Sequence, residues 1–364
     1  MKSLRRARST APRVRSTPAR LDRCRSPPLN PLRAFLASLG RHATLLLAGA
    51  VFIGVALPPL ASVLRPTLPL WIFVLTALTL LRIELAEVAR RIRRPAPIAL
   101  LLLWLLVGAP LLMTAVLRLV DLPRGLAEPL VLWSASPPLA SSPAVAILVG
   151  LDASLALVLM VAGTFLVPLT VPPLVLALLG LRLEIGLGEL MLRLALFVGG
   201  AAIAATIVRR LVGPARLARH ADEVNGATVI AIVLFGIAVM DGMQDWLRTR
   251  PADAALYAAA TLGATLGMQG VATLGFLGMG RRDALTVGLV SGNRNMAIVW
   301  ANLGSAAPPE VMLYFAVIQL PIFILPALLR PVYAWAMRGG ARVDSGETAP
   351  LASARRIAGE GEQG

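Results

Sequence analysis

The feature that most constrains this chain is a series of apolar runs that follow one another with only short polar gaps. Each run is long enough to cross a hydrocarbon core of about 30 Å as a helix. The composition agrees, because 57% of the 364 residues are hydrophobic, 15% are charged and the mean hydropathy is +0.77. A soluble domain carries closer to about 25% charged residues. We therefore expect ten membrane-spanning helices, at about 43–63, 67–88, 97–119, 129–149, 152–175, 186–209, 226–247, 253–279, 284–304 and 310–335.

These spans predict an all-α polytopic membrane protein with one transmembrane domain, at 42–337, and a tail at each end. Residues 1–41 hold eleven Lys and Arg, a single acid and no apolar periodicity, so we expect a disordered basic tail. An organelle transit peptide and an over-long start are the alternatives for this stretch. Residues 338–364 are rich in Gly, Glu and Arg and are expected to form a disordered C-terminal tail.

The arginines between the spans predict the orientation of the chain. The gaps after the second and sixth spans hold four arginines each and the gap after the eighth holds two, against one or two in the gaps after the first, third, fifth and seventh spans. Because arginine-rich short loops stay in the cytoplasm, both termini are expected there, and the chain in the cell (inner) membrane. The net charge of +16 then reflects the basic tail and loops, so we expect the lipid bilayer and not nucleic acid as the partner.

The ten spans divide into two sets of five, at about 43–175 and 186–335, with opposite expected orientations across the membrane. The span centres of the second set follow those of the first by roughly 150 residues. Inverted repeats of this kind are typical of secondary transporters, whose site lies between the repeats near the membrane midplane.

The fourth span is interrupted by Pro137, Pro138 and Pro143, with Ser141 and Ser142 among them. Proline removes an amide donor and clashes with the preceding turn, so a continuous helix is not expected here. Unwound backbone at membrane depth is tolerated where it is buried in protein or lines a wet cavity. A kink packed on neighbouring helices is the alternative to a break that forms part of a site.

The ninth span contains a run of polar residues, Ser291, Asn293, Arg294 and Asn295, around Gly292. Glycine permits a break, and the Ser and Asn side chains can satisfy the freed backbone groups. An arginine at a helix centre in lipid costs about 2.5–3.5 kcal/mol, so Arg294 is expected to face a partner or a wet cavity. It either holds the break together through hydrogen bonds or binds an anionic substrate.

With these residues the sequence resembles the bile acid:sodium symporter family. The resemblance covers roughly residues 40–335 and depends on ten spans, the stretch Ser-Pro-Pro-Leu-Ala-Ser-Ser-Pro at 136–143 and Ser-Gly-Asn-Arg-Asn at 291–295. It implies a panel of four helices and a core of six, with the fourth and ninth spans unwound and crossing at the ion and substrate site. It also implies transport of organic anions, such as bile acids and smaller carboxylates, by alternating access.

The chain departs from the sodium-coupled pattern that the resemblance implies. Where such members have a glutamate and a glutamine around the glycine of the ninth span, this chain has Val290 and Arg294. Ala156, Met160 and Pro143 stand where the same pattern places further ion ligands. The loss of a carboxylate and the gain of a guanidinium argue against sodium coupling, and we expect Arg294 to occupy the space of a sodium ion.

We therefore expect a secondary transporter for a small organic anion, with no cofactor and no metal site. The predicted substrate-binding residues are Ser141, Ser142, Ser291, Asn293, Arg294 and Asn295. A membrane receptor or scaffold that keeps the fold without transport is the alternative. No enzyme is expected, because no histidine lies in a span near the paired serines to act as a base. The single cysteine and the absence of a CxxC motif argue against a metal centre.

Overall fold

The computed structural model describes residues 43–83, 88–89, 95–120, 122–179 and 186–344. The predicted N-terminal tail, most of the predicted C-terminal tail and the arginines at 90–94 lie outside these residues. Within them the regular structure is entirely helical, as the apolar runs predict. The last helix extends to Asp344 and so covers the start of the segment that we expected to be a tail.

The first half of the chain forms helices that follow the apolar runs. Prolines open several of the helices, where a missing amide donor costs nothing. In chain order the elements are α2 (Ala43–Ala56), α3 (Pro58–Leu64), η1 (Arg65–Thr67), α4 (Leu68–Leu81), α6 (Pro95–Leu103), the π-helical turn η2 (Trp104–Gly108), α7 (Ala109–Leu119), α8 (Arg124–Ala135), α9 (Ser142–Val149) and α10 (Ala153–Leu179).

The second half repeats the pattern of long helices and one short, divided pair. Its elements are α11 (Leu187–Val212), α12 (Pro214–Arg219), α13 (Ala221–Ala238), α14 (Met243–Thr249), α15 (Pro251–Gly275), η3 (Leu277–Met279), α16 (Arg281–Gly292), α17 (Met296–Leu303), η4 (Gly304–Ala306), α18 (Pro309–Val317) and α19 (Gln319–Asp344).

Several of these helices are long and apolar enough to cross a membrane. Among the described residues five meet this test, and a bent pair at Pro309–Ile322 and Ile324–Arg338 raises the number to six. The five are Pro58–Leu81, Pro95–Leu119, Ala153–Leu179, Leu187–Val212 and Ala221–Thr249. Two of the other expected spans fall short because breaks at 136–141 and 293–295 divide them.

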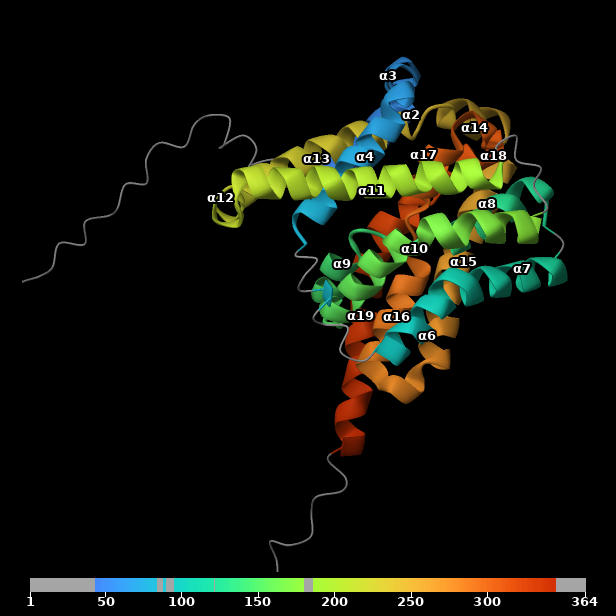
Figure 1. The fold of residues 1–364 in the computed structure, drawn as a ribbon. Helices are drawn as coiled ribbons and strands as arrows, with labels where there is room; N and C mark the ends of the chain where they lie inside the picture. Colours follow the sequence, from blue (N-terminus) through green and yellow to red (C-terminus); the bar gives the residue numbers. More distant parts are fainter. Residues whose placement is uncertain (1–42, 84–87, 90–94, 121, 180–185, 345–364) are drawn as a thin grey trace, which may run out of the picture.

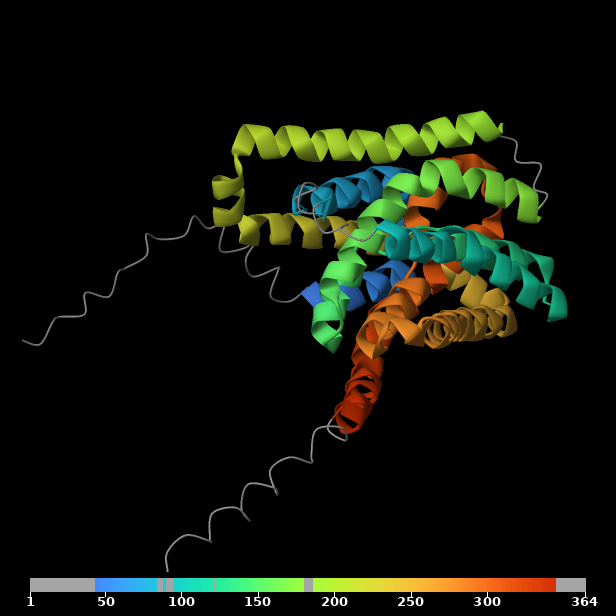
Figure 2. The same cartoon turned by 60° about the horizontal axis from the view of Figure 1, so that its bottom comes forward.

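The helices pack in two layers (Figures 1 and 2). Four of them lie side by side in the order α11, α4, α13, α2, and we call this layer the panel. The short helices α3 and α12 pack against the panel, and most of the remaining helices form the core, in which α10 packs against α8, α9 and α16, and α16 packs along α15. α10 and α17 join the two layers through their contacts with α11, and α17 also contacts α4.

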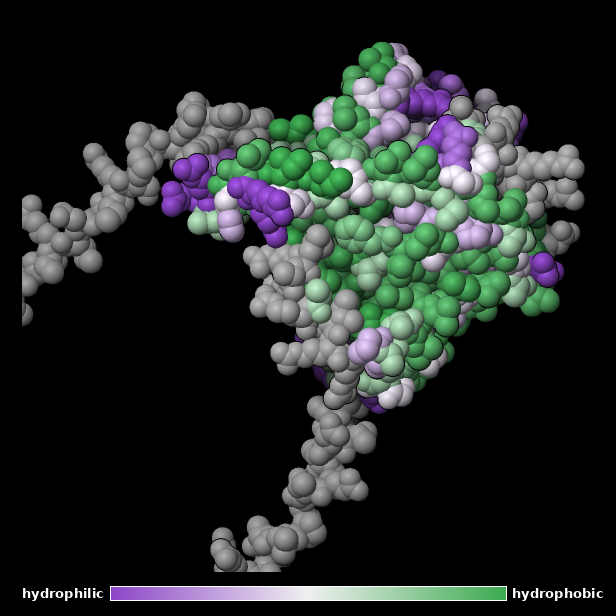
Figure 3. Space-filling model, in the orientation of Figure 1, coloured by the Kyte–Doolittle hydropathy of each residue, from purple (hydrophilic) through white to green (hydrophobic). Residues whose placement is uncertain are grey.

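The outer surface of this assembly is apolar. Figure 3 shows a wide hydrophobic face over the core, with hydrophilic side chains gathered near the ends of the helices. Large side chains such as Phe52, Ile147 and Leu211 are more than 70% exposed, at 74%, 71% and 78%. Soluble monomers rarely expose continuous apolar surface of this extent, so the surface indicates a membrane protein.

Candidate functional site

The two breaks predicted from the sequence lie against each other and form backbone hydrogen bonds. The amide of Leu139 donates to the carbonyl of Asn293 at 2.9 Å, and the amide of Asn295 donates to the carbonyl of Pro137 at 2.7 Å. Pro138 and Arg294 thus form an isolated antiparallel bridge. Each break supplies the hydrogen-bond partners that the other lost when its helix ended, which is how unwound backbone remains stable away from water.

Proline and close packing explain the course of the first break. α8 ends before Pro137, and the extended backbone of Ser136, with φ −65° and ψ 155°, leads into the two prolines. Pro138 then packs on Gly163 of α10, where an added Cβ would lie 2.7 Å from the proline ring. Since only glycine leaves room for this contact, Gly163 allows the Pro138 ring of the first break to pack directly on α10.

Arg294 is completely buried beside the two breaks. Its Nε donates to the carbonyl oxygen of Ser291 at 2.7 Å. Its Nη1 donates to the carbonyl oxygens of Leu105 at 2.8 Å and of Ser136 at 3.1 Å. Its Nη2 has no hydrogen-bond partner in the described part of the chain. The guanidinium therefore sits in a cage of three carbonyl oxygens, contributed by the two breaks and by the third expected span.

Local departures from α-helix geometry free two of these carbonyls. The amide that would bond Ser291 in a continuous helix belongs to Asn295, and it bonds Pro137 instead. In the π-helical turn, the amide of Ala109 bonds Trp104 and so leaves the carbonyl of Leu105 available. The next residue, Pro110, has no amide hydrogen to offer to that carbonyl. The cage is thus a consequence of breaks and prolines on three separate elements.

A cavity of about 470 Å³ lies between the panel and the core, next to the breaks. Arg294 and Asn295 line it from the second break, and Ser141 from the first. The first turns of α9 and α17 also line it, so the amino ends of both short helices contribute to its wall. An amino end carries a partial positive charge and free amide donors, both of which favour an anion.

The predicted site residues divide into two groups. Ser141, Arg294 and Asn295 line the cavity, whereas Ser142, Ser291 and Asn293 are buried beside it. The hydroxyl of Ser291 accepts a hydrogen bond from Trp104 Nε1 at 3.0 Å, which ties α16 to the π-helical turn. The hydroxyl of Ser142 is buried with no partner among the described residues.

Neither a protein-family model nor a curated protein sequence significantly matches the chain. In the described ranges, no group of three or more His, Cys, Asp or Glu side chains is arranged to hold a metal ion.

Arg82 is a functional candidate that the sequence motifs did not reveal. It lines the cavity at the end of α4, and its guanidinium donates to the Val224 carbonyl at 3.1 Å and to the Thr228 hydroxyl at 2.5 Å. Thr76, Thr79 and Thr164 also line the cavity, yet each donates its hydroxyl hydrogen to its own helix. The donors left for an anion are therefore those of Arg82, Ser141, Asn295 and the helix amino ends, whereas the Arg294 guanidinium is buried beside them. The spacing of Thr76, Thr79 and Arg82 along one face of the second expected span is the sequence signal that could have identified this wall.

Proposed function

We propose that the chain is a secondary transporter that moves a small organic anion across the membrane by alternating access. The single observation that carries this proposal is the cavity, whose hydrogen-bond donors come from two paired breaks and two helix amino ends. A site of this composition attracts a carboxylate or a similar group while its remaining wall is apolar. Unwound helix segments that meet near the centre of a membrane protein are the usual site of secondary transporters.

The proposal includes ten spans in two inverted repeats of five, of the bile acid:sodium symporter type. What supports it is the position of the breaks, since the divided pairs α8–α9 and α16–α17 fall on the expected fourth and ninth spans. The panel of four helices and the core agree with the arrangement that the resemblance implies. In this proposal both termini are cytoplasmic and the membrane is the cell (inner) membrane.

The carbonyl cage supports a proposal on coupling. Oxygen atoms of freed backbone carbonyls are ligands that a small hard cation prefers. Here Arg294 places a permanent positive charge among three of them. Val290, at the position where the resemblance implies a glutamate, is buried among apolar side chains such as Leu105. The transporter then has no need of sodium, and it moves its anion with a proton or without a coupled ion.

The test is a thermal-shift screen of the purified chain against small carboxylates and bile acids, with and without sodium, followed by uptake into proteoliposomes. We expect stabilisation by at least one anion in sodium-free buffer, and uptake of that anion. Arg82→Gln and Asn295→Ala are each expected to weaken binding by about 10-fold, because each removes a donor worth about 1.5 kcal/mol. Asn302→Ala is the matched control for Asn295→Ala. The Asn302 amide lies on α17, the short helix that Asn295 precedes, but it donates to the Ile298 carbonyl.

Two outcomes would count against the proposal. If Asn295→Ala bound the anion as tightly as the parent chain, the cavity would not be the anion-binding site. Anion binding without uptake or counterflow would instead support the second candidate, a membrane receptor or scaffold. The buried position of Arg294, whose Nε and Nη1 are bonded to carbonyl oxygens, is the observation that favours this second candidate, because a fixed cation cannot leave with the substrate.

A further inference from the structure

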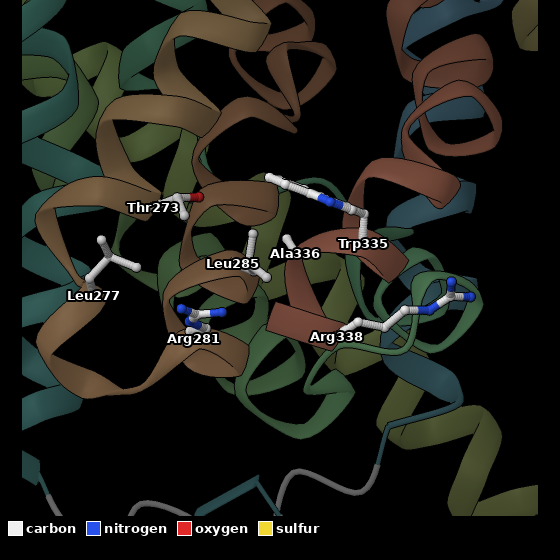
Figure 4. Close-up of a pocket in the computed structure, with 7 residues that line it drawn as sticks. All are labelled: Thr273, Leu277, Arg281, Leu285, Trp335, Ala336 and Arg338. Carbon is white, nitrogen blue, oxygen red and sulfur yellow. The ribbon is translucent and has the colours of Figure 1, made fainter. Parts of the chain in front are cut away.

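A second cavity, of about 660 Å³, lies on the outside of the core between the end of α15, the start of α16 and the last third of α19. We call it the α19 groove. Its apolar wall is formed by Leu277, Leu285, Trp335 and Ala336, and two arginines, Arg281 and Arg338, complete it. In Figure 4 Trp335 extends from α19 across the opening, and both arginines lie below it, one on each side.

The two arginines carry charge that nothing in the described part of the chain neutralises. Both side chains are exposed, and neither has a hydrogen bond or an ion pair with a described residue. The nearest acid on the same helix, Asp283, interacts electrostatically with Asp152 and Arg282. The groove therefore has an apolar wall and two uncompensated positive charges on opposite sides, with the Arg338 side chain extending away from Arg281 (Figure 4).

The surroundings of the groove indicate its depth in a membrane. Trp335 is 75% exposed, and Leu274 and Leu328 on the flanking helices are 69% and 63% exposed. Such apolar side chains face lipid, and tryptophan prefers the boundary between the hydrocarbon and the headgroups. Arg281 belongs to an arginine-containing gap that is expected in the cytoplasm. The apolar wall thus lies at the depth of acyl chains, and the arginines lie at the depth of cytoplasmic headgroups.

We infer that the α19 groove binds one anionic phospholipid of the cytoplasmic leaflet. Its phosphodiester pairs with Arg281 and Arg338, and one acyl chain lies along Leu285 and Trp335. A zwitterionic lipid is a poorer occupant, because its own cationic group competes with the arginines for the phosphate. This inference requires that the chain spans a membrane, and it does not depend on transport.

The test measures thermal unfolding of the purified, delipidated full chain with added lipid. Dioleoyl phosphatidylglycerol is expected to stabilise the chain more than dioleoyl phosphatidylcholine, and soluble glycerol phosphate is expected to have no effect. The double variant Arg281→Gln, Arg338→Gln should weaken the apparent affinity for phosphatidylglycerol by roughly 30-fold, since each basic residue at a membrane surface strengthens binding about 5-fold. The matched control is Arg210→Gln with Arg219→Gln, because these exposed arginines lie at another expected cytoplasmic gap.

A second variant tests the apolar wall without changing the charge. Ala336→Trp fills the groove beside the intact arginines, and we expect it to lower the affinity for phosphatidylglycerol as well. Three results would overturn the inference. They are equal stabilisation by the two lipids, equal losses in the groove and control double variants, and stabilisation by glycerol phosphate as strong as that by the lipid. The last result would identify a site for a soluble phosphate compound.

Discussion

Arg294 holds the two breaks together, which is one of the two uses that its sequence position left open, and it also lies beside the cavity. A buried cation without a partner is strongly unfavourable, so its hydrogen bonds decide whether the side chain is tolerated. The three carbonyls supply partial negative charge but no counterion, and Nη2 remains unsatisfied within the described residues. A residual positive charge therefore remains at the wall of the cavity, where an anion would be stabilised.

Neutral and cationic replacements of Arg294 are expected to behave differently. Arg294→Gln leaves the carbonyls of Leu105 and Ser136 without donors, at a cost of about 1–3 kcal/mol for each unsatisfied group. We expect a melting temperature several degrees lower than that of the parent chain. Arg294→Lys keeps the positive charge and presents its donors on a shorter side chain. It should therefore lower the melting temperature less than Arg294→Gln does. Thermal unfolding in one detergent compares the three chains.

A second experiment measures whether sodium stabilises variants that lack the Arg294 guanidinium. If the guanidinium occupies the place of a cation, then Val290→Glu combined with Arg294→Gln creates a vacant, negatively charged oxygen site. This double variant is expected to gain a stabilisation by sodium that potassium does not give, while the parent chain shows none. A parent chain that sodium stabilises strongly would contradict the assignment of the cage to Arg294.

At the scale of elements, local sequence chemistry located both breaks, whereas their meeting was expected only from the resemblance, which implies that the two spans cross. Pro137 and Pro138 forbid a continuous helix, and Gly292 with its polar neighbours permits one to end, so each break follows from local chemistry. The hydrogen bonds between them join residues about 150 positions apart along the chain, and no local pattern encodes such a pairing. The π-helical turn at Trp104–Gly108 was missed, although Pro110 is a local signal for it.

The packing of α16 on α15 depends on two glycines one turn apart. A Cβ at Gly288 would lie 2.6 Å from the Gln269 carbonyl oxygen, and one at Gly292 would lie 2.7 Å from the Thr265 carbonyl oxygen. Backbone oxygens cannot rotate away, so Gly288→Ala and Gly292→Ala should each force the helices apart and cost about 1–3 kcal/mol. The thermal unfolding midpoint of each purified variant measures this cost.

Two glycines on the partner helix α15 provide the control for Gly288 and Gly292 of α16. Gly263 and Gly267 have nothing within 4 Å of an added Cβ. Alanine there adds no clash and favours the helix slightly, so both variants should match the parent chain or exceed it in stability. A midpoint for Gly292→Ala equal to that of Gly267→Ala would show that the close approach of the two helices tolerates a methyl group.

At the scale of the whole molecule, the sequence predicted the helical class and a surface suited to lipid. It did not predict which helices would form the panel, because apolar residues surround each span and do not distinguish a face toward protein from a face toward lipid. The cavity follows from this packing. Its polar wall includes Arg82 and Thr228, which are 146 positions apart and come together only when α4 packs beside α13.

The position of the cavity predicts the side of the membrane on which it opens. Arg82 and Thr228 line it near the ends of α4 and α13 that join the arginine-rich gaps, so its opening is expected on the cytoplasmic side. A chain with Cys24→Ser and Ser141→Cys should react with an impermeant maleimide in inverted vesicles but not in intact cells, because Ser141 is exposed within the cavity.

Thr249→Cys in the same cysteine-free chain serves as the control for this labelling. Thr249 is exposed in the gap between the seventh and eighth expected spans, which the orientation places outside the cell. It should be labelled in intact cells, and a bound organic anion should protect Ser141→Cys while leaving Thr249→Cys reactive. Labelling of Ser141→Cys from the outside, with Thr249→Cys labelled only in inverted vesicles, would reverse the orientation of the chain. Labelling of both from the outside would mean that the cavity opens to the exterior, as it does in one of the two states of alternating access.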